Sequence, residues 1–263
     1  MKTTRQQQDA TRRQIVASAV DLMTRQGFDG TTMKDIARAA DIGDATIYKY
    51  FPTKDRIVLG YLDDVAHRAL ADTLQTPGFA GYGLQEKLQR LTDAVLERLL
   101  ADREFVAQVR GLARRSPLSM LAEPLAARQS LREAVASFLE AAEASGEIEP
   151  CDFKGLAGSL YTDYLAGVVT YWLADTSDEF ADTTQLVDLS LGVLVQALRG
   201  GLVNRVLQLG GFVLRSQMAR MVQHGSGLMG MLHMAQQAMA SAPAARASQP
   251  PASKAAAEGL APK

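Results

Sequence analysis

Two short helix signals separated by a glycine turn, within residues 31–56 (TTMKDIARAADIGDATIYKYFPTKDR), most constrain what this chain can fold into. Each signal follows a residue that can accept a hydrogen bond from a first-turn amide. Gly43 supplies the backbone freedom that a tight turn needs, and Pro52 ends the second helix. Apolar residues at helical spacing form one face of each helix: Met33, Ile36 and Ala37, then Ile47 and Phe51.

The second predicted helix has an outer face that is small at its start and aromatic and basic at its end. Two helices joined across a turn of about three or four residues that includes a Gly are typical of a helix-turn-helix. In that motif the second helix lies in the major groove of DNA. The outward residues are Asp44, Ala45, Thr46, Tyr48, Lys49 and Tyr50.

At these residues the segment resembles the DNA-binding domain of the TetR family of transcriptional regulators. The resemblance covers residues 9–60 and rests on spaced elements in a fixed order: GF at 27–28, TTM at 31–33, DIA at 35–37, ATIYKYF at 45–51 and TKD at 53–55. Two positions depart from the family pattern. Gly43 stands where Ser is common, so the helix cap is expected at Asp41 or Asp44, and Tyr50 stands where His is common.

The resemblance implies an all-α fold with an N-terminal three-helix helix-turn-helix domain and a larger helical domain for ligand binding and dimerisation. The expected boundaries are residues 1–53, 54–199, 200–240 for a C-terminal helical extension, and 241–263 for a disordered tail. Residues 1–8 are polar and are expected to be mobile. Periodicity predicts helices over 9–27, 54–74, 84–101, 102–115, 125–145, 153–174 and 183–199.

Charge is distributed unevenly along the chain. The whole sequence of 263 residues has a net charge of −1, with 47% hydrophobic and 22% charged residues, an ordinary globular composition. Residues 1–60 contain ten Lys and Arg against seven Asp, a balance of +3, which agrees with nucleic-acid binding. The start lacks the apolar stretch of a signal peptide, so a cytoplasmic location is expected.

Catalytic patterns are missing from the sequence. The three histidines are far apart, and no Ser/His/Asp set, paired carboxylates or phosphate-binding glycine loop stands out. Cys151 is the single cysteine, which excludes an intrachain disulfide and a cysteine-based metal cluster. We therefore expect a protein that is not an enzyme and has no cofactor or metal site.

Seven residues are the candidates for contact with operator DNA. Hydroxyl and ammonium groups that would position the protein on phosphates are Thr32, Tyr48, Tyr50 and Lys54. Residues that would read bases are Ala45, Thr46 and Lys49, because a methyl group can meet the thymine methyl and Lys can donate to guanine. The alternative for the two tyrosines is that they only pack the helix.

The resemblance also implies a mainly apolar ligand cavity enclosed by the helices from residue 84 to 172, and hence a small lipophilic effector. The candidate lining residues are Phe105, Arg110, Phe138, Tyr164, Tyr171 and Trp172. Each of them is alternatively plain core. In the family the last helix pair builds a homodimer interface, and the apolar helices over 153–174 and 183–199 suit that role.

The extension over residues 200–240 contains Arg205, Arg215 and Arg220 and no acid. It is interpreted as extra helices that enlarge the dimer or cover the cavity, or as an amphipathic segment on a membrane surface. Its apolar runs are too broken to span a bilayer, which requires about 20 residues, so no stable membrane insertion is expected. The expected function is a ligand-responsive transcriptional repressor that binds a palindromic operator as a homodimer and is released by the effector. The rival function is a lipid-binding or membrane-surface protein on the same fold that does not bind DNA.

Overall fold

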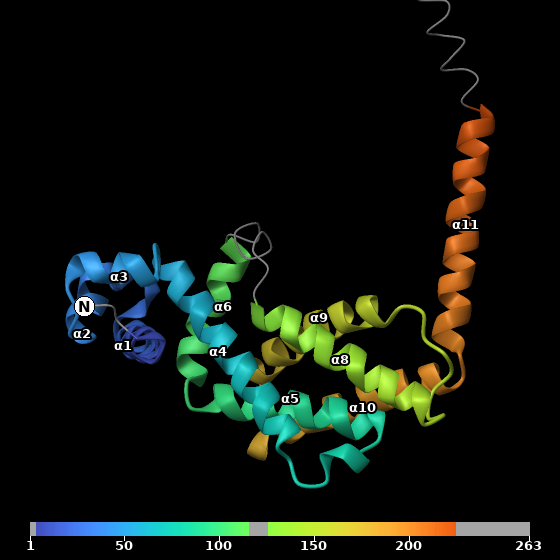
Figure 1. The fold of residues 1–263 in the computed structure, drawn as a ribbon, viewed down its shortest axis with the longest axis horizontal. Helices are drawn as coiled ribbons and strands as arrows, with labels where there is room; N and C mark the ends of the chain where they lie inside the picture. Colours follow the sequence, from blue (N-terminus) through green and yellow to red (C-terminus); the bar gives the residue numbers. More distant parts are fainter. Residues whose placement is uncertain (1–3, 116–125, 225–263) are drawn as a thin grey trace, which may run out of the picture. The chain divides into compact units, whose positions relative to one another are not determined.

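The computed structural model describes residues 4–115 and 126–224, and the expected tail over 241–263 lies outside them. Within the described residues the regular structure is helical, with no strand (Figure 1). The predicted all-α fold is confirmed. The chain divides into two units, Met1–Val206 and Leu207–Lys263, and the helices α1 to α10 belong to the first.

The first helix, α1, extends over Arg5–Gly30, so the expectation of a mobile segment over residues 1–8 is wrong for its described part. Thr4 caps the helix: its backbone N–H donates to Gln7 Oε1 at 3.0 Å, and its hydroxyl accepts from the Gln7 N–H. This reciprocal capping box satisfies two donors that a helix start leaves unpaired. Gly27, at φ 78°, bends the chain near the end of α1.

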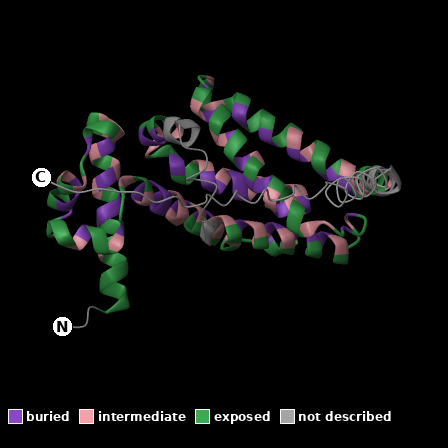
Figure 2. Cartoon of the chain, turned by 90° about the horizontal axis from the view of Figure 1, so that it is seen from above, coloured by how far each residue is buried: buried purple, intermediate pink, exposed green. Residues whose placement is uncertain are grey.

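The helix-turn-helix consists of α2, Met33–Ala39, and α3, Asp44–Tyr50. Helix α2 packs against both α1 and α3, and the three helices contribute side chains to an apolar core. Figure 2 colours the buried residues purple. The core side chains are Ile15, Ala19 and Met23 of α1, Ile36 and Ala37 of α2, and Ile47 and Phe51 of α3 and its end. Packing in this core therefore stabilises two helices that are too short to be stable alone.

The turn between α2 and α3 differs from the expectation at one point. Gly43 itself is the N-cap of α3, and no side chain makes a capping hydrogen bond there, so the expected cap at Asp41 or Asp44 is wrong. Asp41 instead has φ 52°, the left-handed conformation that Asp tolerates better than most residues. The Gly43 carbonyl accepts from the Thr46 N–H at 2.7 Å.

Helix α4, Lys54–Leu74, starts at a Thr53 cap and packs against α1, α5 and α8. Its first turns lie very close to the helix-turn-helix. A Cβ atom at Gly60 would be 2.8 Å from the Phe51 ring, so this approach requires glycine. Helix α4 therefore contributes to the apolar core around α1 and also to the core around α5 and α8.

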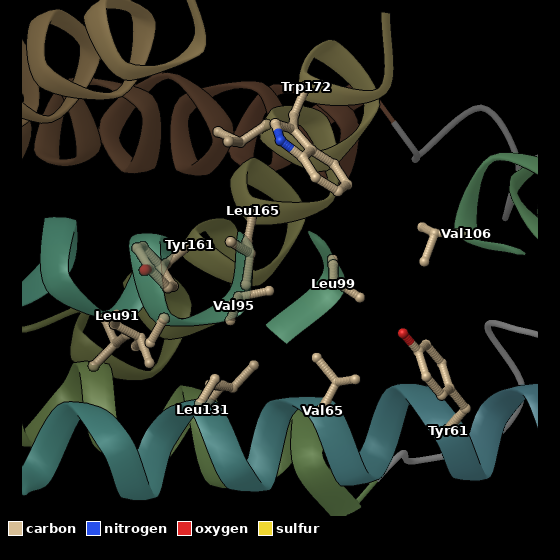
Figure 3. Packing of buried hydrophobic residues seen from close by; sticks show 14 of the residues in the cluster. Tyr61, Val65, Leu91, Val95, Leu99, Val106, Leu131, Tyr161, Leu165 and Trp172 are labelled. Atoms are coloured by element: carbon tan, nitrogen blue, oxygen red, sulfur yellow. The ribbon is translucent and has the colours of Figure 1, made fainter. Parts of the chain in front are cut away.

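The larger helical part consists of α5, Leu84–Leu100; α6, Arg103–Arg115; α8, Ala126–Ala144; α9, Lys154–Ala174; and α10, Ala181–Arg199. Short 3₁₀ turns occur at Phe79–Gly81 (η1) and Asp178–Phe180 (η2). Figure 3 shows the core where α4, α5, α8 and α9 meet. Tyr161 is buried there, with its hydroxyl donating to the Leu88 carbonyl at 3.0 Å and 2.9 Å from the Thr92 hydroxyl.

Helix α11, Leu202–His224, begins at the end of the first unit and continues into the second. Several of its large apolar side chains are exposed: Leu202, Val206, Leu209, Phe212 and Val213. Among the helices of the described part, none is alone long and apolar enough to cross a bilayer. One bent pair, residues 178–199 with 202–213, reaches that length and composition when taken together.

Candidate DNA-binding surface and effector cavity

The outer face of α3 carries the candidate DNA-contacting residues. Ala45, Tyr48 and Lys49 are exposed, and Tyr48 retains 52% of its accessible surface. Thr46 and Tyr50 are half-buried, and Tyr50 packs in part on the core. Inward Ile47 is fully buried on the opposite face, which fixes the rotation of α3 and presents the other residues to solvent.

Thr32 caps α2 in a second capping box. The Asp35 carboxylate accepts from the Thr32 backbone N–H at 3.1 Å and from its hydroxyl at 2.6 Å, and the same hydroxyl accepts from the Asp35 N–H at 3.2 Å. The hydrogen bond from the Thr32 side chain holds the pKa of Asp35 below its usual value. Thr32 is exposed but its hydroxyl is engaged, so a phosphate at this position would meet the start of α2.

Lys54, which the sequence predicts to contact phosphate, also has a structural role. Its ammonium group donates to the backbone carbonyls of Phe28 at 2.5 Å and Thr31 at 2.7 Å, and lies 4.3 Å from the centre of the Phe28 ring. Lys54 therefore ties the start of α4 to the end of α1. Sequence reasoning assigned it to phosphate contact and missed this role, because the acceptors are main-chain atoms 26 and 23 residues away.

An apolar cavity of about 370 Å³ lies among α4, α5, α6, α8 and α9. Its side chains face one another in the region drawn in Figure 3, where Val65, Val95, Leu99, Leu131 and Leu165 are labelled. Its apolar walls are Val58, Leu62, Val65 and Ala66 of α4, Val95 and Leu99 of α5, Val106 and Val109 of α6, Leu131 of α8, and Leu165, Ala166, Val169 and Leu173 of α9. A cavity of this size and lining suits a small apolar ligand.

Polar groups line the cavity from three sides. Arg110 of α6 donates to the Thr170 carbonyl at 3.2 Å. Arg128 of α8 donates to the Thr162 hydroxyl at 3.3 Å and forms an ion pair with Asp163. The remaining charged residue of the lining, on α4, is Asp63.

Of the six predicted lining residues, the structure brings only Arg110 to this cavity. Phe105 instead packs edge-on against Tyr61, and Phe138 against Phe79. The hydroxyl of Tyr164 lies 2.8 Å from the Ser190 hydroxyl of α10. The last two are on α9: Tyr171 is exposed, and Trp172 is buried against Phe180. Five of the six therefore do not line this cavity, and Phe105 borders the larger cleft between α1, α4 and α6 instead.

The residues that sequence reasoning missed are the aliphatic walls and Arg128. Leucine and valine at helical spacing look the same whether they pack against a neighbour or border a void, so the sequence carries no signal for the walls. Arg128 had a weak signal, since an arginine on an otherwise apolar helix face requires a partner.

Helix α6 borders the cavity and also contacts α1 in the N-terminal part of the chain. Val106 and Val109 line the cavity, while the Gln108 side-chain amide donates to the Thr24 carbonyl of α1 at 3.1 Å. Just before α6, Asp102 accepts from the Tyr61 hydroxyl of α4 at 3.0 Å. The α6 region therefore contacts the cavity and also α1 and α4.

A larger cleft, about 990 Å³, lies between α1, α4 and the start of α6. Its lining contains both acidic and basic side chains, so it favours neither an anionic nor a cationic ligand. The charged residues are Asp9, Asp21, Asp64, Asp102 and Glu104, with Arg12, Arg13, Arg68 and Arg103. Arg103 is already engaged, because it donates to the carbonyls of Trp172 and Asp175 at the end of α9. The smaller apolar cavity is the better candidate for an effector.

Within residues 4–115 and 126–224, no group of three or more His, Cys, Asp or Glu side chains is arranged to hold a metal ion. Cys151 is buried, and burial raises the pKa of its thiol. A buried thiol with a raised pKa is a poor nucleophile at neutral pH.

A helix-turn-helix with an exposed polar second helix, carried on a larger helical part with an apolar cavity, defines a DNA-binding transcriptional regulator. The chain belongs to the TetR family. Residues 15–60 match the model of the bacterial regulatory proteins of the tetR family, and residues 87–213 match the tetracyclin repressor-like C-terminal domain.

Known proteins similar to this chain agree with that membership. The HTH-type transcriptional regulator YdeS of Bacillus subtilis (strain 168) is 28% identical over 184 residues, which cover 69% of this chain and 87% of YdeS. UidR of Escherichia coli (strain K12), another HTH-type transcriptional regulator, is 25% identical over 198 residues, covering 73% and 93%. The solved structure of Salmonella enterica GusR shares the fold, with a TM-score of 0.54, 24% identity, and coverage of 76% of this chain and all of GusR.

Proposed function

We propose that this protein is a homodimeric repressor that binds a palindromic operator and leaves it when a small lipophilic effector occupies the cavity among α4, α5, α6, α8 and α9. The observation that carries the proposal is the double contact of α6. Val106, Val109 and Arg110 border the cavity, and Gln108 on the same helix bonds to α1. An effector that shifts α6 changes the orientation of α3, and two-fold related recognition helices then no longer match the groove spacing.

On the operator, Ala45, Thr46 and Lys49 are proposed to contact bases in the major groove. Tyr48 is proposed to donate a hydrogen bond to a neighbouring backbone phosphate. Tyr50 and Thr32 add phosphate contacts, and Lys54 contributes charge close to the backbone of the DNA. The exposure of Ala45, Tyr48 and Lys49 on one face of α3 supports this assignment.

The test is fluorescence anisotropy with the DNA upstream of the protein's own coding region, as a function of salt. Lys49→Ala is expected to weaken binding by about tenfold and to relax selectivity at one base position. Lys54→Ala should weaken all sequences alike, and Lys87→Ala on α5 is the control that should change nothing. Equal losses at every sequence for both Lys49→Ala and Lys54→Ala would contradict the base-reading role.

The homodimer is proposed to form through α9 and α10. Large apolar side chains on these helices are exposed in the single chain: Leu156, Leu160 and Tyr171 on α9, and Leu186, Leu189, Val193 and Leu194 on α10. Such an apolar surface marks a partner interface in a globular protein. A two-fold interface there would pair two α3 helices with two operator half-sites.

In this proposal residues 1–53 bind DNA, residues 54–199 bind effector and dimerise, and residues 200–240 are a helical extension. The protein is expected to act in the cytoplasm, where its operator is. The proposal includes no catalytic step and no cofactor.

The alternative is a lipid-binding or membrane-surface protein on the same fold that does not bind DNA. The exposed Leu209 and Phe212 of α11, with Arg205 and Arg215 on the same helix, favour it. Co-sedimentation with anionic liposomes separates the two functions. Vesicle binding combined with no DNA binding at low salt would favour the alternative.

A further inference from the structure

The charge pattern of the effector cavity identifies the class of ligand, if the proposed effector role of the cavity is correct. Four charged side chains line it: Asp63, Arg110, Arg128 and Asp163. Arg128 and Asp163 neutralise each other in an ion pair, and Asp63 already has an interaction partner. Among the residues that the structure describes, Arg110 forms no ion pair and donates to a main-chain carbonyl, that of Thr170.

Arg110 therefore brings a guanidinium group to a cavity whose walls are mainly aliphatic. A guanidinium group presents several N–H donors in a plane that match the two oxygens of a carboxylate. Arg110 is only partly buried, so an anionic head bound to it retains contact with water while an aliphatic tail is buried. A neutral head group would make no charge-assisted hydrogen bond with Arg110, and a cationic head group would be repelled by the guanidinium.

We propose that the effector is an amphiphile with an aliphatic tail and a carboxylate head, and that Arg110 binds the head. The cavity volume, about 370 Å³, lies near the lower end of the range for ligand sites, about 300 to 1,000 Å³. A medium-chain carboxylic acid fits this volume better than a long-chain one. The tail lies among Val65, Leu99, Leu131 and Val169, and the head at the Arg110 side.

The experiment compares three ten-carbon probes with the full-length protein: decanoate, decan-1-ol and decylamine. Trp172, the single tryptophan, is adjacent to Leu173 of the lining and reports binding by its fluorescence, with calorimetry as a second readout. The wild type should bind decanoate at least about tenfold more tightly than either other probe, the size expected for one charge-assisted hydrogen bond. Decanoate should also release the upstream DNA.

Arg110→Gln should weaken decanoate binding about tenfold and leave decan-1-ol within about twofold. Arg110→Lys keeps the charge without the planar fork and should have an intermediate affinity. Val169→Phe, which fills the tail region, should weaken both probes. Arg132→Gln on α8, outside the cavity, is the control and should behave as wild type.

Equal binding of decanoate and decan-1-ol by the wild type, or an unchanged decanoate affinity in both Arg110 variants, would overturn the carboxylate assignment. Failure of all three probes to bind would overturn it as well. The repressor proposal fails separately, when the protein does not bind the upstream DNA at low salt in any ligand state. If decan-1-ol releases the DNA and Arg110→Gln does not change that release, the carboxylate assignment is contradicted while the repressor proposal is not.

Discussion

Asp175 shows how much of the connection between α9 and α10 depends on one side chain. The carboxylate is buried and accepts from the Ser177 N–H at 2.8 Å, the Ser177 hydroxyl at 2.6 Å, the Thr183 N–H at 2.9 Å and the Thr183 hydroxyl. These hydrogen bonds, from the Ser177 side chain first, hold the pKa of Asp175 well below its usual range. Four donors converge on one anion, so the chain reverses here in a single geometry.

Asp175→Asn is expected to lower the free energy of unfolding by about 2–4 kcal/mol at pH 7, because an amide cannot accept from all four donors. Since the folded pKa is depressed, the stabilisation is present above the unfolded pKa of about 3.9 and is lost as pH falls below it. The difference in the free energy of unfolding between variant and wild type should decrease by about 1 kcal/mol from pH 7 to pH 3. Urea unfolding monitored by Trp172 fluorescence at pH 7 and pH 3 measures the loss of stability and its pH dependence.

Asp178→Asn, at an exposed position in the next turn, is the matched control and should unfold like the wild type. A difference between Asp175→Asn and wild type that stays constant down to pH 3 would show that the ionised carboxylate is not the stabilising species.

At the scale of the element, α8 and α9 approach each other closely at Gly158. Gly158 of α9 faces the main chain of Arg132, and a Cβ atom there would lie 2.6 Å from the Arg132 carbonyl oxygen and 3.1 Å from its Cα. Backbone atoms cannot rotate away as a side chain can, so any larger residue must separate the helices. Helices α8 and α9 both border the apolar cavity.

Gly158→Ala is therefore expected to destabilise the fold by about 1–3 kcal/mol, the usual cost of overpacking a core. Thermal unfolding monitored by circular dichroism measures the change. Gly155→Ala on the same helix is the control, because a Cβ atom there meets nothing within 4 Å and should leave stability unchanged or slightly raised. Equal melting temperatures for the two variants would contradict the close approach.

At the scale of the whole molecule, the exposed apolar face of α9 and α10 should be the dimer interface. Val193 retains 71% of its accessible surface in the single chain. Val193→Asp would place an unpaired charge in that interface, and we expect the dimer to dissociate at least about tenfold more readily. Light scattering after size-exclusion chromatography measures the mass, and unchanged circular dichroism verifies the fold.

Leu209→Asp on α11 is the control for Val193→Asp. It is similarly exposed, and the proposed interface predicts that it leaves the mass unchanged. If Leu209→Asp dissociates the dimer and Val193→Asp does not, the interface lies on α11.

The division of the chain after Val206 leads to a prediction about truncation. A protein ending at residue 206 is expected to keep a cooperative thermal transition within a few degrees of the full-length chain. Leu209, Phe212 and Val213 of α11, which lie beyond that point, are exposed, so removing them loses little buried area. Differential scanning calorimetry measures this, and a much lower transition would mean that the second unit stabilises the first.

Local signals were sufficient for the helices and their order. Thr32 and Thr53 cap α2 and α4 through hydroxyl bonds to amides three residues ahead, a range that sequence spacing alone defines. The outward face of α3 followed from Ile47 and Phe51 turning inward. The cap of α3 was mispredicted because Gly43 satisfies the turn through its backbone carbonyl and leaves no side-chain signal.

The sequence by itself determined the helical class, the helix-turn-helix and its solvent-facing residues, because these depend on contacts within a few residues along the chain. Only the tertiary structure decided where the cavity lies and that Arg110 borders it while Phe138 and Trp172 do not. The physical reason is packing. Whether a side chain fills space or borders a void depends on how helices far apart in the sequence approach, and at Gly158 and Arg132 that approach is set by main-chain contact.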